Sequence, residues 1–329
     1  MKPLLSRLGE LLPHDVSRSV RVLAWASFVL QVVLIGTGGA VRLTASGLGC
    51  PTWPECTDRS FVNTPEMGIH GVIEFSNRML TFVLAVVVIA MFLAVVRNRR
   101  ERRDLFTLAL VQGLSIPFQA VLGGITVLTG LNPYVVGAHF VVSIALVVVT
   151  VVLVYRVRTG PRGTDGSVGG VVVPLAHLTS FFVAVTVMVG ILTTGAGPHA
   201  GDNSNPDKLA PRNGLDPVVL QHVHSWPAYV TFGLTILLVA LLWRRHSEDA
   251  VRRTRRFAGI LVSIELVQIA VGVTQARTGL PVGLVGIHMV LAALLVAAMT
   301  ALILSLRVSR PKESGLRAAE SAAGAVPRG

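Results

Sequence analysis

The sequence predicts an all-α membrane protein with eight transmembrane helices, arranged as two pseudo-symmetric four-helix bundles. Hydrophobic residues make up 52% of the 329-residue chain and charged residues only 14%, a composition typical of an integral membrane protein. Eight apolar segments are each roughly 20 residues or longer, which is enough to cross a bilayer. A pattern of five residues also occurs twice at identical spacing, which indicates an internal duplication.

The eight expected spans lie near residues 20–40, 69–96, 105–128, 134–155, 171–194, 217–243, 255–275 and 282–306. Long loops near 41–68 and 195–216 follow the first span of each group of four. We expect residues 1–160 to form an N-terminal four-helix bundle and residues 161–307 a C-terminal one. Residues 308–329 are rich in Ala, Gly, Ser and Arg without apolar periodicity, so we expect a disordered cytoplasmic tail there.

Basic residues decide the orientation of these spans. They concentrate before the first span, in every second loop and after the last span, within 2–21, 97–103, 156–162, 244–256 and 307–312. The loops on the opposite side hold only scattered basic residues. The positive-inside rule therefore predicts a multi-pass protein of the cell membrane with both termini in the cytoplasm. Because this topology accounts for the formal net charge of +12, no nucleic-acid partner is expected.

The repeated pattern joins a glutamine, three glycines and a histidine. One copy is Gln119, Gly123, Gly130, Gly137 and His139, and the other is Gln268, Gly272, Gly279, Gly286 and His288. Each copy covers two apolar segments joined by a turn with a proline. An even number of spans per repeat keeps both halves in the same orientation, so we expect a parallel repeat.

Histidines lie inside three of the predicted spans. His139 is in the fourth span, His222 and His224 are in the sixth, and His288 is in the eighth. At 1.5 Å per residue, His139, His224 and His288 would each lie roughly 10 Å inside the outer boundary. Two imidazoles on facing helices hold a haem iron axially, so His224 and His288 are candidate ligands. Glycines would let a flat macrocycle approach the backbone, at Gly272, Gly279, Gly283 and Gly286.

The alternative for each histidine is a hydrogen bond to a neighbouring helix. For one histidine alone this alternative is favoured. A layer of histidines matched across a duplication favours a functional site instead, because ionisable residues inside a membrane are costly.

The second span carries a carboxylate and a guanidinium, Glu74 and Arg78. Four residues apart, they can pair on one helix face, and a buried ion pair is the purely structural interpretation. The functional interpretation makes Glu74 a proton-handling group beside a reacting centre. Aligning the sixth span with the second places Gln221 opposite Glu74 and His224 opposite Asn77. This asymmetry suggests that the two halves do different jobs.

The two cysteines, Cys50 and Cys56, lie in the first outer loop, where disulfides persist. A structural disulfide and an exposed, labile redox pair are both open interpretations. His199 in the second outer loop is more simply a solvated loop histidine than a contact for a propionate or another acid.

Together, the duplicated bundles, the histidine layer, the Ile73–Arg78 segment, the Cys-x5-Cys loop and the GAGPHAGD segment at 195–202 resemble the haem A synthase family. The resemblance extends from about residue 23 to 306, and the two loop motifs are most similar to the actinobacterial type. It implies oxidation of the C8 methyl of haem O to a formyl group, giving haem A for cytochrome oxidase. It also suggests haem O synthase as a candidate partner and leaves the electron donor unassigned.

The resemblance further implies a haem b cofactor between His224 and His288 and a substrate haem in the N-terminal half, with Glu74 catalytic. Better-known members have a histidine where this chain has Asn77. Hence His139 alone would hold the substrate haem iron, with Asn77 and Arg78 close by. His70 is expected to be a bystander or a propionate contact.

Two other classes of function use the same residues. A non-enzymatic membrane b-type cytochrome or haem carrier would need the histidines but give Glu74 no chemistry. A transporter built on a parallel repeat is disfavoured, because the sequence shows no pair of broken helices at corresponding mid-membrane positions.

Overall fold

The computed structural model describes residues 16–160, 168–202, 209–245 and 249–307. In this part of the chain a short 3-10 helix, η1 (Pro65–Met67), precedes the second of eight long helices. The long helices are α2 (Arg18–Leu43), α3 (Gly68–Val96), α4 (Arg103–Leu128), α5 (Pro133–Thr159), α6 (Val172–Ala196), α7 (Pro217–Trp243), α8 (Asp249–Arg277) and α9 (Val282–Ser305). All eight are long and apolar enough to cross a membrane. The predicted all-α fold with eight spans is therefore confirmed, while the predicted tail at 308–329 lies outside the described residues.

Local sequence sets where several helices begin. The side chain of Asn132 accepts a hydrogen bond from the Tyr134 amide, and the side chain of Asp216 accepts one from the Val218 amide. Proline is the first residue of both α5 and α7, where its missing amide hydrogen has no helical partner to lose. Helix α8 begins at Asp249, before the expected residue 255, because its arginine-rich first turns are helical without being apolar.

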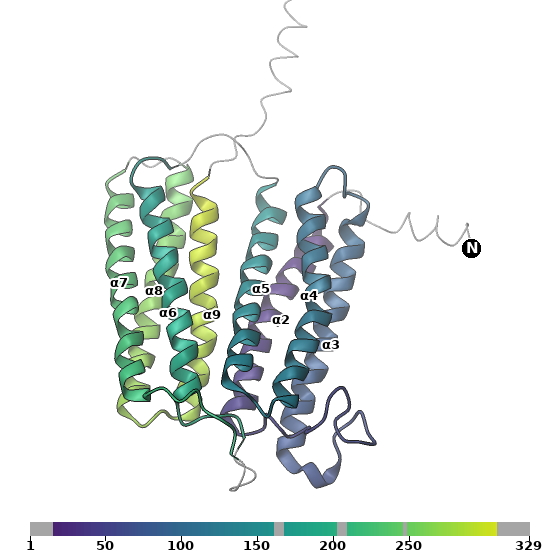
Figure 1. Ribbon diagram of the computed structural model, residues 1–329. Helices are drawn as coiled ribbons and strands as arrows, with labels where there is room; N and C mark the ends of the chain where they lie inside the picture. The colour runs from purple at the N-terminus through teal and green to yellow at the C-terminus, as the bar shows by residue number, and fades with distance from the viewer. Residues whose placement is uncertain (1–15, 161–167, 203–208, 246–248, 308–329) are drawn as a thin grey trace, which may run out of the picture.

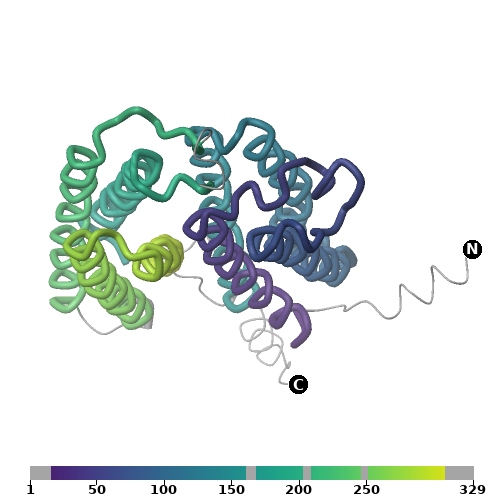
Figure 2. The backbone as a smooth tube through the Cα atoms, turned by 90° about the horizontal axis from the view of Figure 1, so that it is seen from below, coloured from purple at the N-terminus to yellow at the C-terminus, as the bar shows by residue number. Residues whose placement is uncertain are grey.

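The helices pack as two groups of four, α2–α5 and α6–α9, seen side by side in Figure 1 and from one end in Figure 2. In the first group α2 contacts α3 and α5, and α4 contacts the same two helices. The second group repeats this arrangement, with α6 and α8 each contacting α7 and α9. Between the groups, α9 contacts α2 and α5, and α5 contacts α6. The repeated contacts support the expected duplication, whereas the pseudo-symmetry of the bundles and their boundaries stay predictions.

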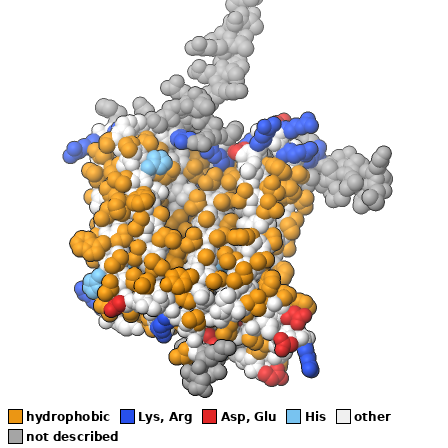
Figure 3. All heavy atoms as spheres, in the orientation of Figure 1, with side chains coloured by type: hydrophobic (Ala, Val, Ile, Leu, Met, Phe, Trp, Pro, Cys, Tyr) orange, Lys and Arg blue, Asp and Glu red, His pale blue; other side chains and the backbone are white. Residues whose placement is uncertain are grey.

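Apolar side chains fill each group and the seam between them. Leu238, Leu261 and Leu302 belong to the core of the second group. A separate apolar cluster joins Ile35 of α2 to Ala293 of α9 at the seam between the groups. Hydrophobic side chains also cover the middle of the surface in Figure 3, while Lys and Arg gather near its upper edge. This banded surface is the one expected of a protein whose outer face contacts lipid.

The two long outer loops meet next to the end of α2. Arg42 donates hydrogen bonds to the carbonyl oxygens of His199, at 2.9 Å, and Thr194, at 3.1 Å. The Nε2 atom of His199 lies 2.9 Å from the carbonyl oxygen of Leu280 in the turn between α8 and α9. The expectation of a solvated loop histidine is therefore wrong, because His199 is half-buried where the loops meet.

Candidate functional site

The histidines of the C-terminal group face each other, as predicted. The rings of His224 on α7 and His288 on α9 have centroids 6.3 Å apart and planes at 74°. Both Nδ1 atoms are buried, and neither has a hydrogen-bond partner among the described residues. Two imidazoles that each place a nitrogen about 2 Å from a shared metal ion have centroids roughly 6 Å apart. This pair therefore fits the axial ligation of a haem iron.

Two glycines make room for this pair of rings. A Cβ atom on Gly190 of α6 would lie 2.9 Å from Cε1 of His224. A Cβ atom on Gly272 of α8 would lie 3.1 Å from Cε1 of His288. Any larger residue at either position would crowd an imidazole. Both helices thus approach the histidines so closely that a side chain at either position would require the imidazole to shift.

The glutamine of the repeated pattern anchors the histidine helix in each half. Nε2 of Gln268 donates to the carbonyl oxygen of His288 at 3.1 Å, and Nε2 of Gln119 donates to that of His139 at 3.4 Å. A Cβ atom on Gly123 would lie 3.4 Å from Cε1 of His139. The repeated spacing therefore corresponds to one repeated contact, in which a glutamine and a glycine of one helix meet the histidine of the next.

The N-terminal half lacks the facing pair within the described residues. Nδ1 of His139 is buried without a hydrogen-bond partner there, while the Asn77 amide oxygen accepts a hydrogen bond from the Thr37 hydroxyl at 2.7 Å. His70 is exposed, and its Nδ1 lies 2.9 Å from the Ser46 hydroxyl oxygen. Among the described residues, this half therefore has one imidazole with an unpartnered buried Nδ1 atom, where the other half has two.

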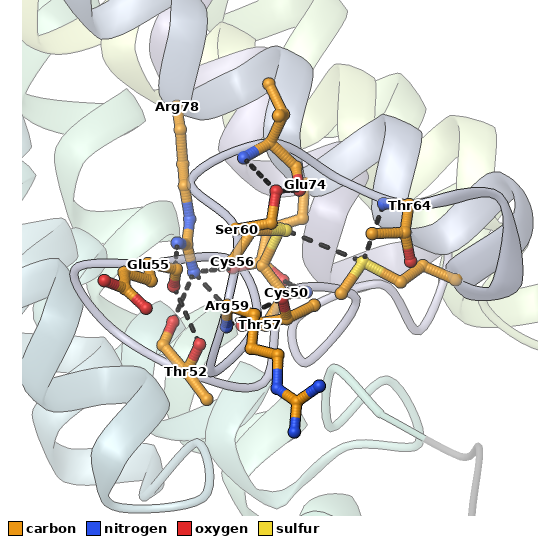
Figure 4. Close-up of a disulfide and its surroundings, with 12 residues drawn as sticks. Cys50, Thr52, Glu55, Cys56, Thr57, Arg59, Ser60, Thr64, Glu74 and Arg78 are labelled. Carbon is orange, nitrogen blue, oxygen red and sulfur yellow. Dashed lines mark hydrogen bonds and ion pairs between the residues drawn. A yellow bond between two sulfur atoms is a disulfide. The ribbon is translucent and has the colours of Figure 1, made fainter.

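Glu74 and Arg78 form the predicted ion pair and also fasten the first outer loop to α3 (Figure 4). Arg78 Nη2 lies 2.6 Å from Oε1 of Glu74, which is only 5% exposed. Oε2 of Glu74 accepts a hydrogen bond from the Cys50 amide at 2.6 Å. Arg78 also donates to the carbonyl oxygens of Cys50, Thr52 and Glu55. The carboxyl group is thus held in place by the loop that covers it.

A disulfide between Cys50 and Cys56 is present, and of the two open interpretations the exposed, labile pair is wrong. Both cysteines are 0% exposed, because the loop folds back onto the helices. Trp53, between the two cysteines, packs so closely on α4 that a Cβ atom on Gly124 would lie 2.3 Å from its ring. Gly123, the preceding residue of α4, lies against the His139 ring. The disulfide loop and the histidine of the N-terminal half therefore pack against neighbouring residues of α4.

Sequence reasoning missed several residues of these sites. Glu265 of α8 is 4% exposed and accepts a hydrogen bond from Thr235; a lone acid inside an apolar span was the available signal. Gly190 had no signal, since its partner lies on another helix. A Cβ atom on Gly286 would lie 3.4 Å from Leu43 of α2, and its expected role beside a macrocycle stays a prediction.

Comparison with known proteins gives the family. Residues 21–300 match the COX15-CtaA family model, described as cytochrome oxidase assembly protein. The chain belongs to this family. The resemblance to haem A synthases is thereby confirmed at the level of the family, and the actinobacterial type stays a prediction.

Relatives of this COX15-CtaA protein carry the name heme A synthase. A protein of Bacillus pumilus is 38% identical over 137 residues, and one of Listeria welshimeri is 27% identical over 146 residues. These matches cover 40% and 43% of this chain, and less than half of each relative, 43% and 48%. A protein of Halalkalibacterium halodurans is 26% identical over 296 residues, covering 88% of this chain and 93% of the relative.

Proposed function

We propose that this protein is a haem A synthase, which oxidises the C8 methyl of haem O to a formyl group. The observation that carries the proposal is the presence of two unlike histidine sites in one chain of the COX15-CtaA family. One half has a facing pair of imidazoles, and the other has a single imidazole with an unpartnered Nδ1 atom together with a buried carboxyl group. A resident cofactor and a reacting haem need such different environments.

The C-terminal half, residues 161–307, is proposed to bind haem b through His224 and His288. The free Nδ1 atoms and the spacing of the rings support this assignment. When bound, haem b supplies one-electron transfer. Gly190 and Gly272 leave space beside the imidazoles, and Gln268 fixes the backbone that carries one of them.

The N-terminal half, residues 1–160, is proposed to bind haem O as substrate. His139 is its proposed iron ligand, because Asn77 is engaged with Thr37 and amide groups are poor ligands for iron. Arg78 and Asn77 complete the proposed substrate site. Haem O synthase is the candidate supplier of the substrate, and the electron donor stays unassigned.

Glu74 is the proposed catalytic residue. Hydroxylation of a methyl group and the later loss of water require proton transfers, and Glu74 is a buried carboxyl group of this half. Arg78 and the Cys50 amide fix both carboxyl oxygens, so any proton that Glu74 handles is taken or given at a defined position. General acid–base groups of this kind contribute about 10²–10⁴-fold to a rate.

The test is pigment analysis of the purified protein after expression with a source of haem O. We expect haem A beside haem b in the wild type, and at least about 100-fold less haem A in Glu74→Gln. Glutamine keeps an oxygen acceptor for the Cys50 amide but cannot accept or release a proton as a carboxyl group does. The matched control, Glu66→Gln, changes an exposed acid of the same outer loop and should keep the wild-type amount of haem A.

Two outcomes would contradict parts of this proposal. Haem A formed by Glu74→Gln at the wild-type rate would leave Glu74 as an anchor of the loop. Haem b alone, with haem O available, would favour the alternative of a membrane b-type cytochrome, which the facing pair His224–His288 would also serve.

A further inference from the structure

The proposed function does not use one buried acid of the C-terminal half. Glu265 of α8 is 4% exposed, and its Oε2 atom has no hydrogen-bond partner in the described part of the chain. Its Oε1 atom accepts a hydrogen bond from the Thr235 hydroxyl at 2.8 Å. A carboxyl group in the apolar interior of a membrane protein is costly unless it has a task.

Three threonines connect this acid with the proposed haem site, and we call Thr186, Thr231 and Thr235 the threonine column. On α7, Thr231 and Thr235 follow His224 by seven and eleven residues and so share its helix face. They are 3% and 0% exposed. The Thr231 hydroxyl lies 3.5 Å from that of Thr186 on α6. Thr186 is one helical turn from Gly190, the glycine packed against the His224 ring. The column therefore starts beside His224 and ends at the acid.

The N-terminal half shows that the fold does not require this column. The internal duplication aligns α3 with α7, matching Asn77 with His224, and α4 with α8, matching Gln119 with Gln268. In this alignment Thr231 and Thr235 match Leu84 and Val88. Glu265 matches Ile116. The same scaffold is thus built with apolar residues in the half that lacks the facing histidines. The polar residues belong specifically to the half with the proposed resident haem.

We propose that Glu265 is a proton-binding site coupled to the redox state of the haem in the C-terminal half. This rests on the proposed function only for the presence of that haem. The carboxylate takes up one proton from the aqueous phase, forming an O–H bond, when a reductant delivers one electron to the bound iron. A ferric haem with neutral histidine ligands carries a positive charge that favours the carboxylate. Reduction removes this charge and favours the neutral acid.

The hydrogen bonds of Thr235 accommodate both forms of the acid. The Thr235 hydroxyl lies 2.8 Å from Oε1 of Glu265 and 3.0 Å from the carbonyl oxygen of Thr231. It has one hydrogen, so it donates to only one of them at a time. With the carboxylate, the hydroxyl donates to Glu265. With the neutral acid, Glu265 donates to the hydroxyl, which turns toward Thr231.

Few other groups near Glu265 could take up this proton. Helix α8 packs against α7 and α9, whose titratable groups in the membrane are His222, His224 and Tyr229 on α7 and His288 on α9. His222 and Tyr229 are exposed on the outside of the bundle. His224 and His288 are the proposed iron ligands. Among the described residues no Arg or Lys forms an ion pair with Glu265.

The test is a redox titration of the purified full chain with haem b bound, followed by the haem absorption bands at several pH values. In the wild type we expect the midpoint potential to fall as pH rises, by up to about 59 mV per tenfold change in proton concentration. Glu265→Gln should remove this dependence, and Glu265→Asp should keep it. Gln112→Leu, at a buried polar residue of α4 in the other half, is the matched control and should also keep it. Wild-type dependence in Glu265→Gln would overturn the proposal.

A second measurement tests the proposal if the Glu265→Gln protein fails to bind haem. In a reduced-minus-oxidised infrared spectrum of the wild type, reduction should add the C=O band of a protonated carboxyl group, and Thr235→Val should shift this band. No added band would overturn the proposal. A preparation without haem b would overturn the proposed function instead, so the two failures are distinguishable.

Discussion

At the residue scale, the absence of a side chain at Gly272 determines how closely α8 packs against the His288 ring. With a methyl group in its place, the new Cβ atom would lie 3.1 Å from Cε1 of His288, so the imidazole would have to shift by a few tenths of an ångström. Glycine inside a helix is itself unfavourable by about 0.5–1 kcal/mol relative to alanine. The chain thus keeps a residue that weakens α8 at the position where the helix passes the histidine.

We therefore expect Gly272→Ala to separate stability from haem binding. The helix should be at least as stable, while overpacking that costs about 1–3 kcal/mol should weaken haem b binding roughly 5- to 150-fold. Haem b per protein and the unfolding temperature check the two effects. The control is Gly259→Ala on the same helix, since a Cβ atom there has nothing within 4 Å. Equal haem content in the two variants would contradict the role of Gly272.

At the scale of elements, the first outer loop is held by contacts on both of its sides. Arg78 and Glu74 of α3 bind its backbone, and the Trp53 ring lies on Gly124 of α4. The disulfide is buried as a result. A change in α4, distant in sequence from the cysteines, should therefore alter their reactivity.

Gly124→Val tests this arrangement. A Cβ atom 2.3 Å from the Trp53 ring cannot be accommodated unless the loop moves. We expect faster reduction of the Cys50–Cys56 disulfide by an added thiol and lower haem A formation, with haem b retained in the other half. Gly113→Val on the same helix is the control, because a Cβ atom there meets nothing within 4 Å. Unchanged reduction in Gly124→Val would show that the ring does not hold the loop closed.

The elements also show which features sequence alone can predict. All eight spans were predictable, because length, apolar composition and loop charge are local properties. The facing of His224 and His288 was predictable, because each lies seven residues after the proline at the start of its span and so at the same depth. The burial of the disulfide was not, since it depends on Arg78 and Trp53 meeting the loop from two helices. Glu265 was detectable as an acid in an apolar span, but the threonine column is visible only in three dimensions.

At the scale of the whole molecule, the two halves have a common framework and different contents. A glutamine and a glycine meet the histidine in both halves. Polar residues then differ, with Glu74 and Arg78 in one half and the threonine column with Glu265 in the other. The halves touch through α2, α5, α6 and α9 and through Arg42 at the outer loops. Division of labour between a reacting haem and a resident haem is consistent with such a design.

The orientation of the molecule is the remaining prediction at this scale. Basic residues gather at one end of the helices, the upper edge in Figure 3, and the disulfide loop is at the other. The positive-inside rule places the basic end in the cytoplasm, which puts the buried disulfide on the side where disulfides persist. Two kinds of reporter can be compared, one active only in the cytoplasm and one active only outside the cell. Fused after Arg310, only the cytoplasmic reporter should be active. Inserted after Asp58, an exposed loop residue, only the outside reporter should be active. The opposite pair of signals would invert the molecule, and signals on one side for both would contradict the number of spans between them.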